Sequence, residues 1–165
     1  MSKRNIRPSI LPSVIDRMTD REPHIAAEPP ATHSQSMREL KQSLRRDLEW
    51  LLNSRRNPTP IPEGARYLPR SVFAYGLPDI TGVSLNSERD RQQLIHIIED
   101  AVVAFEPRLT AVTVSLLPVE THARILRFQI EGLLRTDPAP ERISFDTTLK
   151  LASGIYEVEA ERRAG

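Results

Sequence analysis

Cysteine is absent from the 165-residue sequence. This absence excludes disulfide bonds, thiolate catalysis and cysteine-ligated zinc sites. Long apolar runs are absent as well, because no stretch approaches the roughly 18 residues that a membrane-spanning helix needs. Residues 1–20 also lack the continuous apolar segment of a signal peptide. We therefore expect a soluble, cytoplasmic protein without direct membrane insertion.

Net charge is almost lacking too, because 23 basic and 22 acidic residues leave a balance of +1. A chain with so small a balance has no overall field that would drive binding to nucleic acid or to an anionic membrane. Twenty of the 23 basic residues are arginine, which suits paired hydrogen bonds to carboxylates at protein interfaces. We therefore expect protein partners and no nucleic acid.

Recognisable catalytic motifs are scarce. The four histidines show no metal-ligand spacing, and the sequence has no nucleophile elbow, P-loop or dinucleotide-binding glycine motif. Carboxylates on the predicted helices could form a glycosidase acid–base pair only by facing each other across a cleft in unlike environments, and their spacing indicates no cleft. We therefore predict that the protein is not an enzyme and has no cofactor or metal. The histidines are His24, His33, His96 and His122, and the carboxylates considered are Asp47, Glu49, Glu99 and Asp100.

The stretch 86–117 predicts a helix, a sharp corner and a strand. Ser87 and Asp90 match the capping box that satisfies free N–H groups in the first turn of a helix. Apolar residues then recur at steps of three and four, which places them on one face of the helix. That predicted face consists of Leu94, Ile97, Ile98, Ala101 and Phe105.

The corner is set by Pro107, which lacks the N–H that a helix needs and disfavours helical geometry in the residue before it. The helix should therefore end near Phe105. Apolar and polar residues then alternate over 112–116, as in a half-buried strand. The carboxylate of Glu106 and the guanidinium of Arg108 are thus expected on either side of a rigid corner.

An earlier helix is predicted to begin at Ser36, with Glu39 completing a capping box, and to end near Arg55. Trp50 lies off its apolar stripe and has two interpretations. It is either covered by the following loop, or it is a docking residue, since exposed tryptophans are favoured anchors at interfaces. The stripe is Met37, Leu40, Leu44, Leu48, Leu51 and Leu52, whereas Arg45, Arg46, Asp47 and Glu49 indicate a solvated side.

Two further alternating runs, 124–135 and 143–151, and a short run at 155–158 predict more strands. Their connections of about six to eight residues are too short for helical crossovers, so neighbouring strands should be antiparallel. Gly132 is a candidate β-bulge. The fold class is therefore α+β, with two amphipathic helices packed on a small antiparallel sheet of three to four strands.

The predicted domain organisation has three parts. Residues 1–35 form a tail and proline-rich linker, which is either disordered or becomes ordered on a partner. Residues 36–158 form a single α+β domain, and residues 159–165 form a charged tail. Inside the domain, the connection 57–85 is long enough to suggest a function or packing by its own side chains, with a short helix at 71–75.

Six short stretches form an ordered set along nearly the whole chain. They are Ile15-Asp16-Arg17-Met18-Thr19-Asp20, Arg46-Asp47-Leu48-Glu49-Trp50-Leu51-Leu52-Asn53, Tyr75-Gly76-Leu77-Pro78-Asp79, Phe105-Glu106-Pro107-Arg108, Ser144-Phe145-Asp146-Thr147 and Ser153-Gly154-Ile155-Tyr156. The set resembles the TssE family of type VI secretion system baseplate subunits. That family is similar to a wedge component of contractile-phage tails and is historically labelled lysozyme-like. Glu-Pro-Arg alone would be a weak signal, but the ordered set is specific.

The resemblance implies structural work. Members of the family join the TssF, TssG and TssK subunits in a baseplate wedge and nucleate the contractile sheath of TssB and TssC. Their fold is taken to resemble the interlocking domain of the sheath, in which strands from neighbouring subunits add to a small sheet. The implied location is cytoplasmic, in a baseplate near the inner membrane.

The family's Glu-Pro-Arg motif falls on Glu106, Pro107 and Arg108, and the resemblance implies that these residues bind the sheath. Glu106 and Arg108 either pair with an incoming sheath subunit or stabilise only the protein's own corner. Trp50 is a second candidate for partner binding. The alternative functions are a lysozyme-like peptidoglycan hydrolase and a free regulatory adaptor of related fold.

Overall fold

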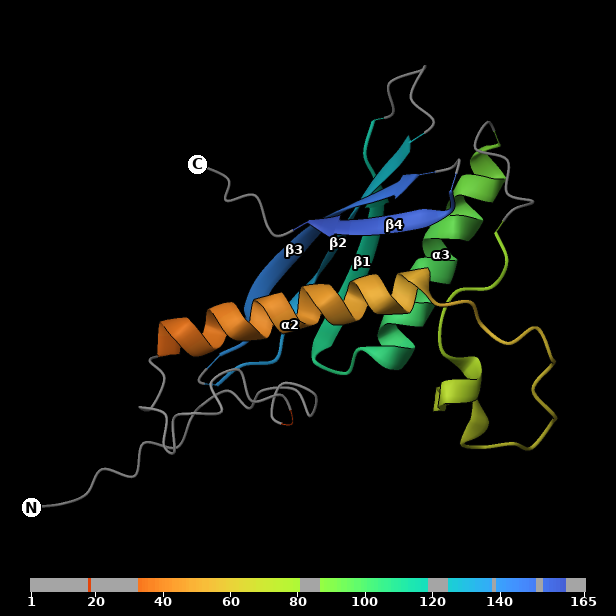
Figure 1. The fold of residues 1–165 in the computed structure, drawn as a ribbon, viewed down its shortest axis with the longest axis horizontal. Helices are drawn as coiled ribbons and strands as arrows, with labels where there is room; N and C mark the ends of the chain where they lie inside the picture. The colour runs from red at the N-terminus through yellow and green to blue at the C-terminus, as the bar shows by residue number, and fades with distance from the viewer. Residues whose placement is uncertain are drawn as a thin grey trace, which may run out of the picture.

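The computed structural model shows two helices packed on a four-stranded antiparallel sheet (Figure 1). The described residues are 18, 33–80, 87–118, 125–137, 139–150 and 153–159. The helices are α2 (His33–Asn53) and α3 (Glu88–Phe105), and the loop between them contains the short 3-10 turns η1 (Leu68–Arg70) and η2 (Val72–Ala74). The predicted α+β class is therefore confirmed.

The sheet is a simple meander. Its strands are β1 (Leu109–Leu116), β2 (Ile125–Leu134), β3 (Glu141–Lys150) and β4 (Ile155–Glu159), in the spatial order β1-β2-β3-β4. Each strand pairs antiparallel with the next one along the chain, as the short connections predict. β1 and β4 are consequently the two edges, and β1 begins directly after the predicted corner.

One face of the sheet forms the core together with both helices. Alternation along β2 buries Phe128 and Ile130 completely, and Phe145 on β3 joins them. α3 contacts β1, α2 contacts β4, and the two helices contact each other. Each large apolar side chain buried in this way contributes about 1.5–3 kcal/mol. Val102 of α3 is fully buried although it lies outside the predicted stripe.

The predicted bounds hold for α3 and need correction for α2. The Ser87 side chain accepts a hydrogen bond from the N–H of Asp90 at 3.3 Å, and the helix ends at Phe105, both as predicted. In contrast, α2 begins at His33, three residues before the predicted cap at Ser36 and inside the predicted linker. No proline or glycine separates 33 from 36, so nothing stops the helix from extending backward.

The bulge lies on β1 and not at Gly132, so this prediction was wrong in its location. Pairing shifts between Thr110 and Thr113, which leaves Ala111, at φ 50°, within the bulge. Gly132 itself pairs in continuous register with Ile143 of β3. A Cβ on Gly132 would lie 3.3 Å from the carbonyl oxygen of Thr110. The glycine therefore permits the close approach of the bulged strand.

The loop after α2 is tied back to the end of that helix. The N–H of Leu77 donates to the carbonyl oxygen of Ser54 at 2.9 Å, and the N–H of Arg56 donates to the Leu77 carbonyl at 2.8 Å. Gly76, at φ 100°, makes this approach possible, since a Cβ there would lie 2.3 Å from the Ser54 carbonyl oxygen. The short helix expected at 71–75 is the 3-10 turn η2.

Some predictions fall outside the described residues. They concern residues 1–17 and 19–32, residues 81–86, His122, Arg124, Leu151 and residues 160–165.

Candidate functional site

Three residues turn the chain from α3 into β1. The last helical hydrogen bond runs from the N–H of Glu106 to the carbonyl oxygen of Val102 at 2.8 Å. Glu106 then leaves helical geometry, with φ −119° and ψ 78°, as expected before a proline. The N–H of Leu109 donates to the Glu106 carbonyl at 3.1 Å. A tight turn therefore closes around Pro107, which is exposed at its tip.

The Glu106 side chain is buried and fully engaged by Arg108. Only 4% of Glu106 is exposed. The Arg108 guanidinium donates from Nε to Oε1 at 2.7 Å and from Nη2 to Oε2 at 2.5 Å. The backbone N–H of Arg108 adds a third bond to Oε1 at 3.2 Å. This two-pronged, charge-assisted pairing is the strong form of an arginine–carboxylate contact, and it fixes the shape of the corner.

The same guanidinium also connects the corner to α2. Arg108 donates from Nη2 to Oδ2 of Asp47 at 2.6 Å and from Nη1 to the Ser43 hydroxyl at 3.1 Å. Ser43 and Asp47 lie four residues apart, so both project from one face of α2. Arg108 retains 24% side-chain exposure and Asp47 retains 22%. A single cation thus holds a turn and a helix together through two carboxylates and a hydroxyl.

A second arginine extends the network to the surface. Arg46 donates from Nη2 and Nε to Oδ1 of Asp47 at 3.0 and 3.2 Å. Its guanidinium carbon lies 5.1 Å from the ring centroid of Trp50, within cation–π range. Trp50 is 49% exposed. Of the two interpretations of Trp50, the structure agrees with an exposed residue and not with one covered by the following loop.

The charges of the site shift two pKa values. Burial alone would lower the pKa of Arg108, but the hydrogen bonds and charges of Glu106 and Asp47 outweigh burial and raise it. Burial raises the pKa of Tyr75, and the carboxylates of Asp47 and Glu106 raise it further. Tyr75 packs edge-to-face on Phe105 with ring centroids 5.3 Å apart. The loop motif that contains Tyr75 therefore lies beside the corner.

The sequence prediction missed the role of Asp47 and Ser43. Asp47 was expected on a solvated side of the helix, whereas it forms a partly buried ion pair with Arg108. A signal did exist, because both residues follow the leucine stripe of α2 by three residues, Ser43 after Leu40 and Asp47 after Leu44. Ser43 and Asp47 therefore lie at the border of the apolar stripe, where a polar side chain can reach a cation that packs beside the helix.

Both edges of the sheet carry hydrogen bonds from helix side chains. On β1, Glu99 of α3 accepts the N–H of Val114 through Oε1 at 2.8 Å. The N–H of Leu117 donates to the carbonyl oxygen of Arg127 on β2. Backbone groups of successive residues point to opposite sides of a strand, so those of Leu116 and Val114 face outward, away from β2. Among the described residues, Leu116 has no hydrogen-bond partner on that outward side.

The β4 edge is closed more completely. The Asn53 side chain accepts the N–H of Tyr156 at 2.9 Å and donates to its carbonyl oxygen at 2.8 Å. One amide of α2 therefore pairs with both outward groups of Tyr156, as a neighbouring strand would. Arg45 adds a bond from Nη1 to the carbonyl oxygen of Val158 at 3.1 Å. Such covering of an edge protects a sheet against pairing with another chain.

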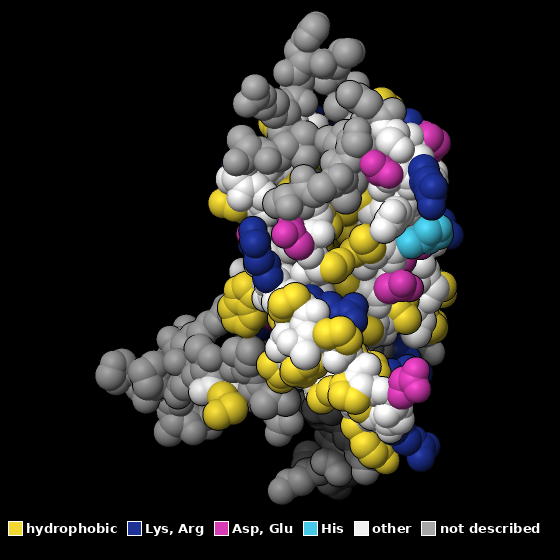
Figure 2. All heavy atoms as spheres, turned by 90° about the vertical axis from the view of Figure 1, so that its right-hand side faces the viewer, with side chains coloured by type: hydrophobic (Ala, Val, Ile, Leu, Met, Phe, Trp, Pro, Cys, Tyr) yellow, Lys and Arg dark blue, Asp and Glu magenta, His cyan; other side chains and the backbone are white. Residues whose placement is uncertain are grey.

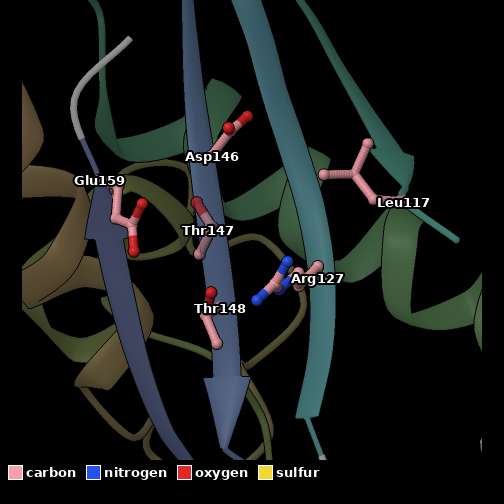
Figure 3. Close-up of a pocket in the computed structure, with 6 residues that line it drawn as sticks. All are labelled: Leu117, Arg127, Asp146, Thr147, Thr148 and Glu159. Atoms are coloured by element: carbon pink, nitrogen blue, oxygen red, sulfur yellow. The ribbon is translucent and has the colours of Figure 1, made fainter. Parts of the chain in front are cut away.

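A shallow cavity lies on the outer face of the sheet, away from the corner (Figure 3). Its volume is about 160 Å³, which is room for a few water molecules. Figure 3 shows the Arg127 side chain reaching across toward Thr148 on the neighbouring strand. The lining residues are Leu117, Arg127, Asp146, Thr147, Thr148 and Glu159. Its small volume and its mixture of acidic and basic side chains are typical of a polar sheet face that water covers.

Other chemistry is sparse in the described part of the chain. No group of three or more His, Asp or Glu side chains there is placed to hold a metal ion. His96 is exposed on α3, with Nδ1 3.3 Å from Oε2 of Glu99, as expected for a surface residue. The carboxylates of Asp47 on α2 and Glu106 at the corner share Arg108 as their partner and do not face each other across a cleft. No described helix has the length and apolar character to cross a membrane.

These features define a class: a small α+β protein in which a partly buried ion network joins the helix–strand corner to α2. Comparison with protein families makes the class specific. The model of the baseplate wedge protein gp25 matches residues 38–139, which is well over half of the chain. The chain belongs to the family of the baseplate wedge protein gp25. Among curated proteins, none matches this sequence.

The matched region contains the complete ion network. It spans Ser43, Asp47, the corner and the first two strands. The family is one of structural baseplate subunits, which agrees with the resemblance seen in the sequence and does not favour the peptidoglycan hydrolase.

Proposed function

We propose that this protein is a baseplate subunit of a type VI secretion system that joins the TssF, TssG and TssK wedge and nucleates the TssB/TssC sheath. The observation that carries this proposal is the Arg108 network, which fixes an exposed turn directly beside an edge strand. A fixed turn next to an edge strand gives an incoming subunit both a position and a pairing partner. The proposed location is the cytoplasmic side of the inner membrane.

The three residues of the corner have different parts in this proposal. Pro107 is exposed and forms the contact with the sheath subunit. Glu106 is buried and Arg108 is mostly buried, so they act by holding Pro107 and the start of β1 in position. Preorganisation of this kind lowers the entropy cost of docking. The remaining exposed part of Arg108 adds polar contact at the rim.

The incoming strand adds to β1. The β4 edge offers little backbone there, because Asn53 occupies both groups of Tyr156 and Arg45 occupies the carbonyl of Val158. The β1 edge is held at the N–H of Val114 by a carboxylate, which has no hydrogen to donate to a carbonyl. An added strand would supply both donors and acceptors and would displace the side chain of Glu99.

Trp50 is proposed as a contact with another wedge subunit. Its half-exposed ring is held by Arg46, which is itself fixed by Asp47. Aromatic and arginine side chains held in this way are typical of interface hot spots. The sheath contact and the wedge contact would thus lie at opposite ends of one ion network.

The decisive experiment separates folding from assembly. Pro107→Ala, Arg108→Ala and wild type are purified for thermal unfolding and are also produced in cells that carry a fluorescent sheath subunit. We expect Pro107→Ala to remain folded, to co-purify with TssF, TssG and TssK, and to form far fewer sheaths. If sheath formation is lost only in variants that also unfold, the corner serves the monomer alone and the docking role fails.

A further inference from the structure

A second surface lies on the loop that follows α2, at residues 54–72, which we call the arginine loop. The loop is held in place at its base by hydrogen bonds between Ser54, Arg56 and Leu77. Ser71 also caps η2, because its hydroxyl accepts the N–H of Phe73. The loop therefore presents its side chains from a defined position and not as a free coil.

Large apolar side chains stand exposed on this loop. Tyr67 is 81% exposed and Val72 is 90% exposed. Figure 2 shows hydrophobic side chains gathered over the lower half of this face, with lysine and arginine side chains between and beside them. Because these side chains stay in water, they contribute no hydrophobic stabilisation to the isolated protein. It is typical of a surface that another molecule covers.

The charge of the loop is strongly one-sided. Residues 54–72 include four arginines and a single acidic residue, Glu63. The arginines are Arg55, Arg56, Arg66 and Arg70, and all are exposed. None has an ion-pair partner within the described residues, whereas Lys41, Arg46, Arg91 and Arg108 elsewhere each do. Arg66 lies over the ring of Tyr67, 5.8 Å from its centroid.

The loop also borders a groove against α3. The groove holds about 220 Å³ and is open to solvent. Most of the residues that line it are apolar, and Arg56 and Asp100 are its two charged residues. The residues that form it include Arg56, Ile61 and Pro69 from the loop and Ile97, Ala104 and Phe105 from α3. A volume of this size accommodates one or two apolar side chains.

We propose that the arginine loop and this groove bind an acidic segment of another protein, with an apolar side chain in the groove and carboxylates on Arg56, Arg66 and Arg70. Charge complementarity selects this partner. It also argues against the chain's own N-terminal residues 1–32, which carry five basic and four acidic residues. This contact uses neither Glu106, Pro107 and Arg108 nor β1, so it goes beyond the function proposed above.

The test uses site-specific photo-crosslinking in cells that produce the protein at its native level. Tyr67 and Val72 are replaced, one at a time, by p-benzoylphenylalanine, and Ile155, which is 49% exposed on β4, is the control position. Cross-linked peptides are identified by mass spectrometry. We expect Tyr67 and Val72 to capture one shared protein segment that carries a net negative charge, and Ile155 not to capture it.

Charge reversal then decides whether the arginines recognise that segment. Arg66→Glu combined with Arg70→Glu should lower the cross-linking yield about tenfold or more, whereas Arg142→Glu on the outer face of β3 should not. Thermal unfolding verifies that both variants are folded, and Arg66→Gln with Arg70→Gln is the milder second variant. Cross-links to lipid, to a neutral or basic segment, or to a second copy of this chain would overturn the proposal, as would no cross-link at all.

Discussion

Arg108 and Asp47 form an ion pair at 2.6 Å although 61 residues separate them in the sequence. Because Arg108 binds Glu106 at the same time, one guanidinium connects the helix–strand corner to the opposite helix. The pair keeps about a quarter of its surface in water. The ion pair therefore joins two distant segments of the same chain at a position close to the molecular surface.

Removal of the Arg108 side chain should strongly destabilise the fold. Arg108→Ala leaves the buried carboxylate of Glu106 without its cation, and truncation of one member of a largely buried pair costs about 2–5 kcal/mol. We expect a loss at the lower end of that range because the pair is partly hydrated. Urea unfolding measures it. Arg142→Ala, at an exposed position on β3, is the matched control and should change the free energy of unfolding by less than about 0.5 kcal/mol.

Gly76→Ala should be far more harmful than Gly64→Ala. Both glycines have positive φ, 100° and 83°, so alanine costs about 1–2 kcal/mol in backbone strain at either position. A Cβ at Gly76 would also lie 2.3 Å from the Ser54 carbonyl oxygen, whereas Gly64 faces open space. Thermal unfolding of the two variants should differ by several degrees. Equal melting temperatures would show that the loop is not anchored at Ser54.

The stability of the protein should fall at alkaline pH. Burial, followed by the charges of Asp47 and Glu106, raises the pKa of Tyr75, and burial raises the pKa of Tyr156. Unfolded tyrosines lose their proton near pH 10. The stabilisation is therefore complete below pH 10 and is lost as the pH rises through the folded values. Urea unfolding at pH 8 to 11 should show this decline, and Tyr75→Phe should make it shallower.

Tyr156→Phe should not destabilise the protein at neutral pH. The buried hydroxyl of Tyr156 has no hydrogen-bond partner among the described residues, and an unsatisfied buried polar group is unfavourable by about 1–3 kcal/mol. The ring would keep its edge-to-face contact with Phe128. We expect an unchanged or slightly higher free energy of unfolding. A clear loss would indicate a bound water molecule or another partner at the hydroxyl.

The two edge contacts should respond differently to truncation. Asn53→Ala exposes both backbone groups of Tyr156 and should promote self-association through β4, which size-exclusion chromatography at increasing protein concentration would detect.

Glu99→Ala frees the N–H of Val114 and should leave sheath nucleation intact or increased. Gln42→Ala, on the exposed surface of α2, is the control. Loss of nucleation in a folded Glu99→Ala protein would argue against strand addition at β1.

Local signals predicted much of this fold. Ser87 caps α3 as its spacing with Asp90 indicates, and Pro107 ends that helix at Phe105, because caps and prolines act within a few residues of themselves. The alternation of apolar and polar residues predicted the buried faces of β2 and β3, because this pattern is also contained in a short stretch of sequence. The start of α2 was predicted three residues too late, since polar residues without a breaker define no sharp boundary.

The rest depends on contacts between distant segments. The need for glycine at 132 comes from the carbonyl of Thr110 on the neighbouring strand, so the sequence around 132 holds no sign of which strand bulges. The pairing of Asp47 with Arg108 likewise depends on how α2 crosses the corner. The Glu-Pro-Arg triplet was identified from its resemblance to a family, whereas its partners on α2 required the structure.

The difference in hydrogen bonding between the β1 and β4 edges has a consequence for the direction in which subunits can add. Under the strand addition proposed above, a subunit whose β4 margin is occupied by its own helix receives a neighbour on the β1 side alone. Repeated addition would then have one possible direction, away from the first subunit. An asymmetry produced by the Asn53 and Arg45 side chains would thus give a growing filament a defined starting end.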